Sequence, residues 1–169
     1  MTIHSEHPFL EPEDDRDPVR RLRGRLGGAV VLFTAGSRHR AGLTVSSVMV
    51  GHGEPAHVLA LLDEDADFTD AVRREGRAVV HLLQWEHRDL ADAFAGLAPA
   101  PGGVFTLGTW RQTEWGPLLD GVPTWAGVRL LHEQDDAGWS LLFNFAVEHV
   151  EVGDDAAPLV HRRGHYVRP

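Results

Sequence analysis

Short apolar segments separated by glycine- and proline-containing turns restrict the fold of this chain more than any other feature. Three apolar strand candidates follow Ala29 within about thirty residues, with turn signals at 35–37 and 51–53 between them. Regular alternation of strands and helices, which a doubly wound parallel sheet requires, is absent from this order. The pattern therefore predicts a mainly β protein, a barrel with appended α-helices.

Three segments have the signals of the appended helices. Asp17-Pro18 is typical of an N-cap followed by proline at the first helical position, and 27–28 ends that helix. Its period turns Val19, Leu22 and Leu26 inward. A second helix is expected over 68–75 with Asp67 as its cap, and a third over 86–95. In the third, a shared face is formed by Leu90, Ala91 and Phe94.

The last third of the chain is expected to return to β-structure. Strands at 125–132 and 139–152 are joined by a hairpin turn at 134–138. Before them, 97–108 is rich in alanine, proline and glycine and is predicted to be a long loop. Large aromatic side chains follow at 105, 110 and 115, where core or interface is the expected setting.

Composition removes several classes of function. With 0 cysteines, disulfides and cysteine-ligated metals are impossible, and the absence of lysine rules out a P-loop. The formal net charge of −9 disfavours nucleic acid as a partner. No metal site is expected, because the arrangement of the 11 histidines does not suggest one. No apolar stretch is long enough to cross a membrane and no signal peptide is evident, so a cytoplasmic protein is expected.

The domain organisation is expected to be simple. Residues 1–17 form a polar, acidic N-terminal arm, and a single domain spans 18–169. Neither an internal repeat nor a second composition regime divides that domain.

The run at 40–47, Arg-Ala-Gly-Leu-Thr-Val-Ser-Ser, stands out chemically. Ala41 and Gly42 allow another group to approach the backbone closely. A strand that required only core packing would favour valine, isoleucine and phenylalanine over this mixture of small and hydroxyl residues. Two interpretations stay open from the residues alone: a flat polar ligand lying against the strand, or an edge strand with solvated hydroxyls.

Five segments in order resemble the flavin reductase-like family, whose FMN-binding domain is a split β-barrel. They read RAGLTVSS, EPAHVLALL, GRAVVHLL, LADAFAG and PLVHRRGHY, within a resemblance that spans about Pro18 to Tyr166. The resemblance implies that FMN, or FAD, binds along 43–47, and that Asp63 to Phe68 runs beside the ribityl chain and phosphate. Family members are typically homodimers. The residues for which it implies flavin contact are Arg40, Ala41, Gly42, Leu43, Thr44, Val45, Ser46, Ser47, Leu62, Asp63, Ala66, Asp67, Phe68 and Gln84.

The activity implied is NAD(P)H-dependent flavin reduction by hydride transfer to flavin N5, which requires positioning and no acid–base catalytic residue. The reduced flavin could supply a monooxygenase partner. Two departures from the family stand against this. The phosphate-side loop at 63–67 is acidic, and the Gly-Asp-His signature of many members is replaced by Ala137-Gly138-Trp139. The tryptophan could stack on nicotinamide, although a barrel residue is the expected role.

Two alternatives therefore remain from the sequence. One is a non-catalytic flavin-binding sensor or carrier. The other is a split barrel that has lost flavin and binds another ligand or a protein partner.

Overall fold

The computed structural model describes residues 17–155 and 157–169, so the expected arm at 1–17 lies almost wholly outside the described residues. Strand makes up 44% of the structure and helix 21%, which confirms the mainly β class. The helical elements are α1 (Pro18–Leu26), α2 (Asp67–Glu75), η2 (Trp85–His87), α3 (Arg88–Phe94) and η3 (Val104–Thr106). The strands are β1 (Gly28–Ala29), β2 (Val31–Ala35), β3 (Ala41–Val45), β4 (Val48–Gly51), β5 (His57–Leu62), β6 (Arg77–Leu82), β7 (Trp110–Gln112), β8 (Pro117–Leu119), β9 (Trp125–Ala137), β10 (Ser140–Glu151), β11 (Val160–Arg162) and β12 (His165–Val167).

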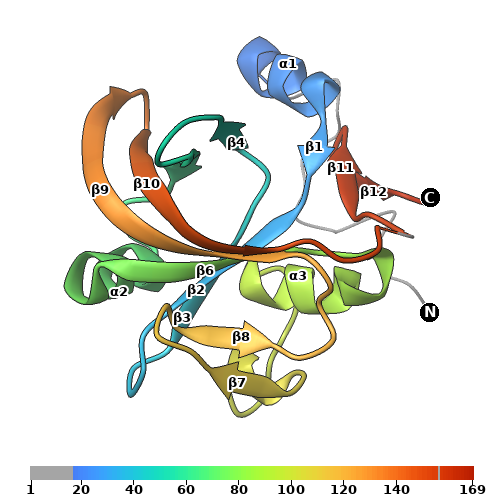
Figure 1. Cartoon of the computed structure of the whole chain (residues 1–169). Coiled ribbons are helices and arrows are strands. Elements are labelled where there is room, and N and C mark those ends of the chain that lie inside the picture. Colours follow the sequence, from blue (N-terminus) through green and yellow to red (C-terminus); the bar gives the residue numbers. More distant parts are fainter. Residues whose placement is uncertain (1–16, 156) are drawn as a thin grey trace.

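A seven-stranded antiparallel sheet in the order β3-β2-β6-β9-β10-β5-β4 is the centre of the molecule. The long strands β9 and β10 bend strongly, so that the sheet curls into an open barrel (Figure 1). Small sheets β1-β11-β12 and β7-β8 flank it. Within the described residues, no helix has both the length and the apolar character needed to cross a membrane.

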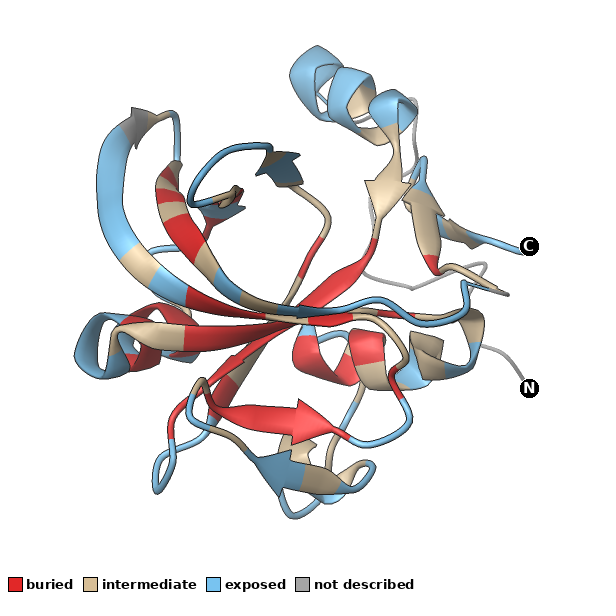
Figure 2. Ribbon diagram, in the orientation of Figure 1, coloured by how far each residue is buried: buried red, intermediate tan, exposed pale blue. Residues whose placement is uncertain are grey.

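Strand β2 is buried along its whole length because it has a core on each face. On one face Phe33 packs against Phe68 of α2 and Phe145 of β10, with ring centroids 5.6 and 5.7 Å apart. On the other face, Leu32 joins a second cluster that contains Phe94 of α3. Figure 2 shows this continuous buried region through the middle of the fold. The sheet is thus a middle layer between two cores.

Helices α2 and α3 are where the sequence predicts them. Asp67 was expected to cap α2, but the N-cap is Ala66, which makes no side-chain hydrogen bond to the helix. In α3, Ala91 and Phe94 are buried in the second cluster and Leu90 packs against it, which confirms the predicted face. Phe105 and Trp110 also pack in this cluster, as expected of core aromatics.

Helix α1 begins as predicted, with the Asp17 carboxylate accepting hydrogen bonds from the backbone N–H groups of Val19 and Arg20 at 3.0 and 3.3 Å. The prediction that its apolar side faces inward is wrong for this single chain. Val19, Leu22 and Leu26 are 71%, 62% and 78% exposed, and no residue of α1 is buried. The helix projects from the barrel, so its apolar residues find no core beneath them (Figure 1).

The glycine of the 40–47 run is required by a close contact inside the protein. A Cβ atom on Gly42 would lie 2.6 Å from Cε1 of Phe94 and 3.0 Å from the Phe33 carbonyl oxygen. The close approach that the sequence predicts is therefore made by α3 of the same chain. Alternation along β3 sends Gly42 and Thr44 toward α3, while Ala41, Leu43 and Val45 pack in the first core.

We expect Gly42→Ala to destabilise the protein by about 1–3 kcal/mol, because the added methyl overpacks a filled contact. Gly51→Ala is the matched control, since its Cβ would meet nothing closer than His57 Cβ at 3.9 Å. Urea unfolding of both variants measures the difference. Adding Phe94→Leu to Gly42→Ala should recover part of the lost unfolding free energy. If the destabilising effects of the two substitutions simply add, the contact between residue 42 and the Phe94 ring is contradicted.

Buried His81 connects three elements. Its Nδ1–H donates to the Leu32 carbonyl at 2.8 Å, and its Nε2 accepts from the Leu119 N–H at 3.1 Å. Burial is the main cause that lowers the pKa of His81 to about 4. The folded protein therefore holds this imidazole neutral, and the ring joins β6 to β2 and β8.

We expect stability to fall as the pH drops from about 6.5 toward 4, because the unfolded chain protonates His81 first. The shift corresponds to about 3 kcal/mol of unfolding free energy, fully present above pH 6.5. Urea midpoints across this range, compared with those of His81→Gln, isolate the effect. The variant should be less stable at neutral pH with a flatter pH profile; an equally steep profile would assign the pH dependence to other histidines.

Candidate functional site

The two serines at the end of the 40–47 run lie in a bend between strands. Strand β3 ends at Val45 and β4 begins at Val48, so Ser46 and Ser47 are outside both strands and half-buried. Within the described residues, neither hydroxyl has a hydrogen-bond partner. The hydroxyl of Thr44, in contrast, donates to the Ala91 carbonyl at 2.7 Å. The hydroxyls that a ligand could use are therefore those of the two serines.

The bend lies directly beside the end of β5. The Ser47 carbonyl accepts from the Leu61 N–H at 3.1 Å, and the β4–β5 register pairs Val48 with Ala60. Continuing this register places Ser46 opposite Leu62, with Asp63 next along the chain. The fold thus joins two segments that are separated in sequence.

A turn follows β5 and leads into α2. The Asp63 carboxylate accepts from the Asp65 N–H at 3.0 Å, and the Asp63 carbonyl accepts from the Thr69 hydroxyl at 2.6 Å. Because Ala66 provides no side-chain cap, the first N–H groups of α2 have no carboxylate or hydroxyl of their own helix as acceptor. We call the two segments, residues 46–47 and 63–67, the bend–turn surface.

Two of the expected site residues support this surface from beneath. Leu62 and Phe68 are 1% and 0% exposed, and both belong to the first core. Their side chains hold the end of β5 and the start of α2 in place, so a ligand would meet only their backbone. The same holds for Val45, which is 5% exposed.

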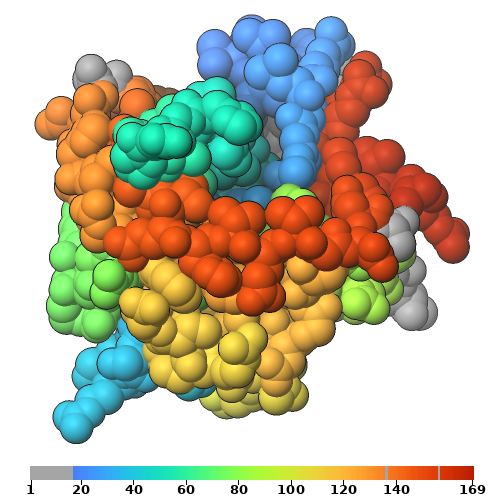
Figure 3. Space-filling model, in the orientation of Figure 1, coloured from blue at the N-terminus to red at the C-terminus, as the bar shows by residue number. Residues whose placement is uncertain are grey.

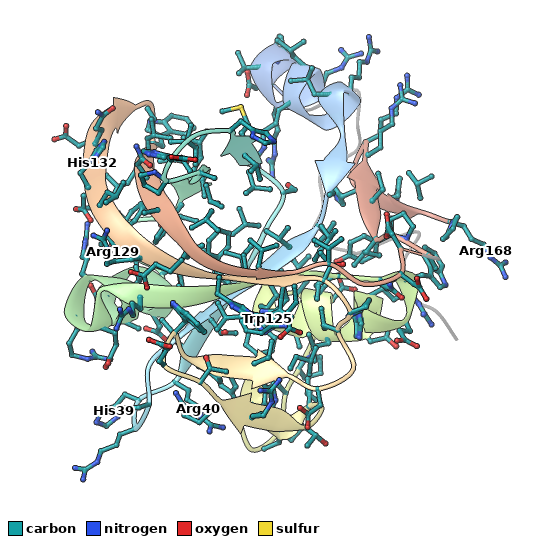
Figure 4. All side chains as sticks on the ribbon, in the orientation of Figure 1. His39, Arg40, Trp125, Arg129, His132 and Arg168 are labelled. Carbon is teal, nitrogen blue, oxygen red and sulfur yellow. The ribbon has the colours of Figure 1, made fainter. Side chains whose placement is uncertain are left out.

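Arg40 lies away from the bend–turn surface. Near the end of β2, Thr34 pairs with Val79, which lies near the start of β6. Because β6 starts immediately after α2, the tip of the β2–β3 hairpin lies at the C-terminal end of α2. That end is about 13 Å from the turn, given the rise of a nine-residue helix. Arg40 there donates to Gln112 Oε1 at 3.3 Å, and Figure 4 shows it beside His39.

The polar groups of Gln84 are also engaged elsewhere. Its backbone N–H donates to His87 Nδ1 at 3.0 Å, and its side-chain Nε2 donates to the Asp154 carbonyl at 2.9 Å. The structure therefore brings together Thr44 to Ser47 with Leu62 to Phe68. It places Arg40 at the other end of α2 and engages the polar groups of Gln84 with His87 and Asp154.

The bend–turn surface is strongly acidic. Its four carboxylates, which are all exposed, belong to Asp63, Glu64, Asp65 and Asp67. Arg73, on α2, interacts with Glu64 electrostatically, but its guanidinium is bound by Glu133 at 2.8 and 3.0 Å. The hydrogen bond to Glu133 is the main cause that raises the pKa of Arg73. The arginine is thus already neutralised.

A cavity of about 530 Å³ lies on another side of α3. Its floor is apolar, with Leu90, Leu107 and Leu119, and its rim has the carboxylates of Glu86 and Asp120. Part of the cavity wall is the long loop at 97–108, which the sequence predicts from its alanine, proline and glycine content. No other sequence feature indicates a cavity here. No arginine is among the described lining residues, so the cavity does not suit a phosphate-bearing ligand.

Trp139 occupies the tip of the β9–β10 hairpin. Ser140 pairs with Ala137, which makes the turn tighter than the sequence predicts. The side chain is 103% exposed, so the expectation that it is a barrel residue is wrong. No three histidine, aspartate or glutamate side chains of the described part of the chain are grouped to hold a metal ion.

The donors of the bend–turn surface fit part of a flavin. Isoalloxazine has a polar edge of carbonyl and imino groups, and the serine hydroxyls with the adjacent backbone offer both donors and acceptors for it. The N–H groups of Asp67 and Phe68, at the start of α2, offer further donors for a hydroxylated chain, whereas that of Thr69 donates to the Ala66 carbonyl at 2.8 Å. The ring and the ribityl chain of a flavin are therefore compatible with this surface.

Sequence comparisons find relatives along nearly the whole chain. FMN reductase (NADH) RutF of Agrobacterium fabrum is 28% identical over 147 residues, 85% of this chain and 84% of its own. NADH-dependent FMN reductase AsuE2 of Streptomyces nodosus subsp. asukaensis is 30% identical over 158 residues, 91% and 85% of the two chains. The 4-hydroxyphenylacetate 3-monooxygenase reductase component of Pseudomonas aeruginosa is 26% identical over 155 residues, covering 90% and 89%.

Solved structures share the fold. The NADH:FAD oxidoreductase SgcE6 of Streptomyces globisporus has a TM-score of 0.80 at 21% identity, covering 95% of this chain and 96% of its own. Flavin reductase PheA2 also has a TM-score of 0.80, at 20% identity and with 91% and 99% coverage. The family model described as "Flavin reductase like domain" matches residues 23–169. The chain therefore belongs to the flavin reductase-like family, as its five sequence segments indicated.

Proposed function

We propose that the chain is an NAD(P)H:flavin oxidoreductase that transfers a hydride from a reduced nicotinamide to a flavin such as FMN or FAD. The observation that carries this proposal is the bend–turn surface, where free serine hydroxyls and uncapped helix N–H groups meet in a member of the flavin reductase-like family. Two of the relatives named above are called NADH-dependent FMN reductases, which supports the same chemistry.

Within this proposal the protein binds and orients its two substrates. The flavin supplies the electron-accepting ring, and effective positioning of two rings is worth many orders of magnitude in rate. Ser46 and Ser47 hold the polar edge of the ring, and Thr44 fixes the bend through its bond to Ala91. His81 has both ring nitrogens bonded inside the core, so it takes no part in proton transfer.

The reduced flavin leaves for a monooxygenase partner. One relative is named as the reductase component of a monooxygenase, which supports this role. The protein acts in the cytoplasm, where proteins rarely contain disulfides; its 0 cysteines are consistent with this location.

The active form is a homodimer in which the partner copy covers α1. Val19, Leu22 and Leu26 are exposed on α1, and Met49 and Val50 of β4 are 64% and 73% exposed. Figure 3 shows α1 and β4 on the same face of the molecule. Each apolar side chain that becomes fully buried contributes about 1.5–3 kcal/mol, so covering these residues favours self-association.

Purified protein mixed with flavin and NADH is expected to oxidise NADH in catalytic excess over the free-flavin background. Ser46→Ala/Ser47→Ala should weaken flavin binding about tenfold, since two hydrogen bonds are lost. Ser37→Ala, at the distant β2–β3 hairpin tip, is the matched control. Flavin fluorescence quenching and NADH absorbance measure the two effects.

The outcomes separate the alternatives left by the sequence. Bound flavin without NADH oxidation would identify a sensor or carrier. Failure to bind any flavin would leave a barrel that serves another ligand or a protein partner.

Leu22→Asp is expected to convert the dimer to a monomer, because it places a charge in the apolar face of α1. Arg25→Glu changes the charge of the same helix but keeps its apolar residues, so it should remain dimeric. Light scattering coupled to size-exclusion chromatography gives the masses. A wild-type monomer at micromolar concentration would contradict the proposed dimer.

A further inference from the structure

The acidic turn of the bend–turn surface is built rigidly beside the two serines. The Asp63 side chain accepts the Asp65 N–H, and its carbonyl holds the Thr69 hydroxyl. The backbone bond from Leu61 to Ser47 connects this turn to the bend. Because the β4–β5 register continues to Ser46 opposite Leu62, with Asp63 as the next residue, a ligand seated on the serines extends beside the acidic turn.

No cation of the described turn offsets these charges. Residues 63–67 contain four carboxylates and no basic residue. Arg73 is held by Glu133 at 2.8 Å and is 3.7 Å from Asp70, so its charge is already balanced. Arg40 lies at the opposite end of α2, on Gln112. At the turn itself, a ligand anion would therefore meet four carboxylates and no basic side chain of the same segment.

Riboflavin and FMN differ at this surface in one group. Both present the same ring and ribityl hydroxyls, but FMN ends in a phosphate monoester that is close to a dianion at neutral pH, with a second pKa of about 6. Like charges that remain unpaired repel, and the repulsion is screened by salt. The ring thus favours binding and the terminal phosphate opposes it.

We propose, on the basis of the proposed function, that Asp63, Glu64, Asp65 and Asp67 make this reductase bind riboflavin more tightly than FMN. The expected difference is about tenfold at physiological salt and larger at low salt. FMN remains a substrate, held by its ring and released readily. The acidic turn therefore makes the flavin an exchangeable substrate of this enzyme, which suits delivery of the reduced flavin to a second protein.

The test is the ratio of the FMN and riboflavin dissociation constants, measured by quenching of flavin fluorescence. The ratio should approach one as the salt concentration rises to about 1 M. It should fall part of the way as the pH drops below about 6, where the phosphate dianion becomes a monoanion. Glu64→Gln/Asp65→Asn/Asp67→Asn should lower the ratio about tenfold at low salt by tightening FMN while leaving riboflavin unchanged. This variant keeps Asp63, whose bond to Asp65 N–H orders the turn.

Glu54→Gln/Asp120→Asn/Asp154→Asn is the matched control. It removes three exposed carboxylates outside the bend–turn surface and changes the net charge equally, so it should leave the ratio as in the wild type. Wild-type protein that binds FMN as tightly as riboflavin at low salt would overturn the proposal. If both triple variants lowered the ratio equally, the proposal would also be overturned, because the effect would then come from the net charge of the protein. Absence of binding by either flavin would overturn the proposed function itself.

Discussion

The burial of β2 on both faces is the constraint on which the rest of the structure depends. A strand with apolar side chains on each side requires a layer above and a layer below it. Helix α2 and the curled strands provide one layer through Phe68 and Phe145, and α3 provides the other through Phe94. His81 stabilises this arrangement, because its two ring nitrogens form buried hydrogen bonds with the carbonyl of Leu32 and the N–H of Leu119.

The same packing creates the bend–turn surface. Because Gly42 admits the Phe94 ring and Thr44 bonds to Ala91, β3 lies tightly on α3 and ends at Val45. The chain must then bend through the two serines to reach β4, and the register with β5 brings the acidic turn alongside. Within the 40–47 run, Gly42 thus serves internal packing, whereas the hydroxyls of Ser46 and Ser47 stay without a partner among the described residues.

Several apolar groups have no place in the core of a single chain. The apolar side of α1 is exposed because the helix projects beyond the barrel, and Trp139 is exposed because the hairpin turn is tight. The periodicity of α1 indicated that this side is buried, and a second copy of the chain satisfies that pattern in the dimer we propose. The helical period of the apolar residues indicates that one face of the helix is apolar. It does not indicate whether the same chain or a second copy covers that face.

The sequence alone determined the mainly β class and the family, because turn residues and strand patterns act locally and the five segments keep their order. It also indicated the helix starting at Pro18 and the apolar face of α3. Only the tertiary structure decided that Arg40 lies apart from the serines, that Gln84 bonds to His87 and Asp154, and that Leu62 and Phe68 are core residues. Strand register sets these positions, and it arises from contacts between residues far apart in the chain.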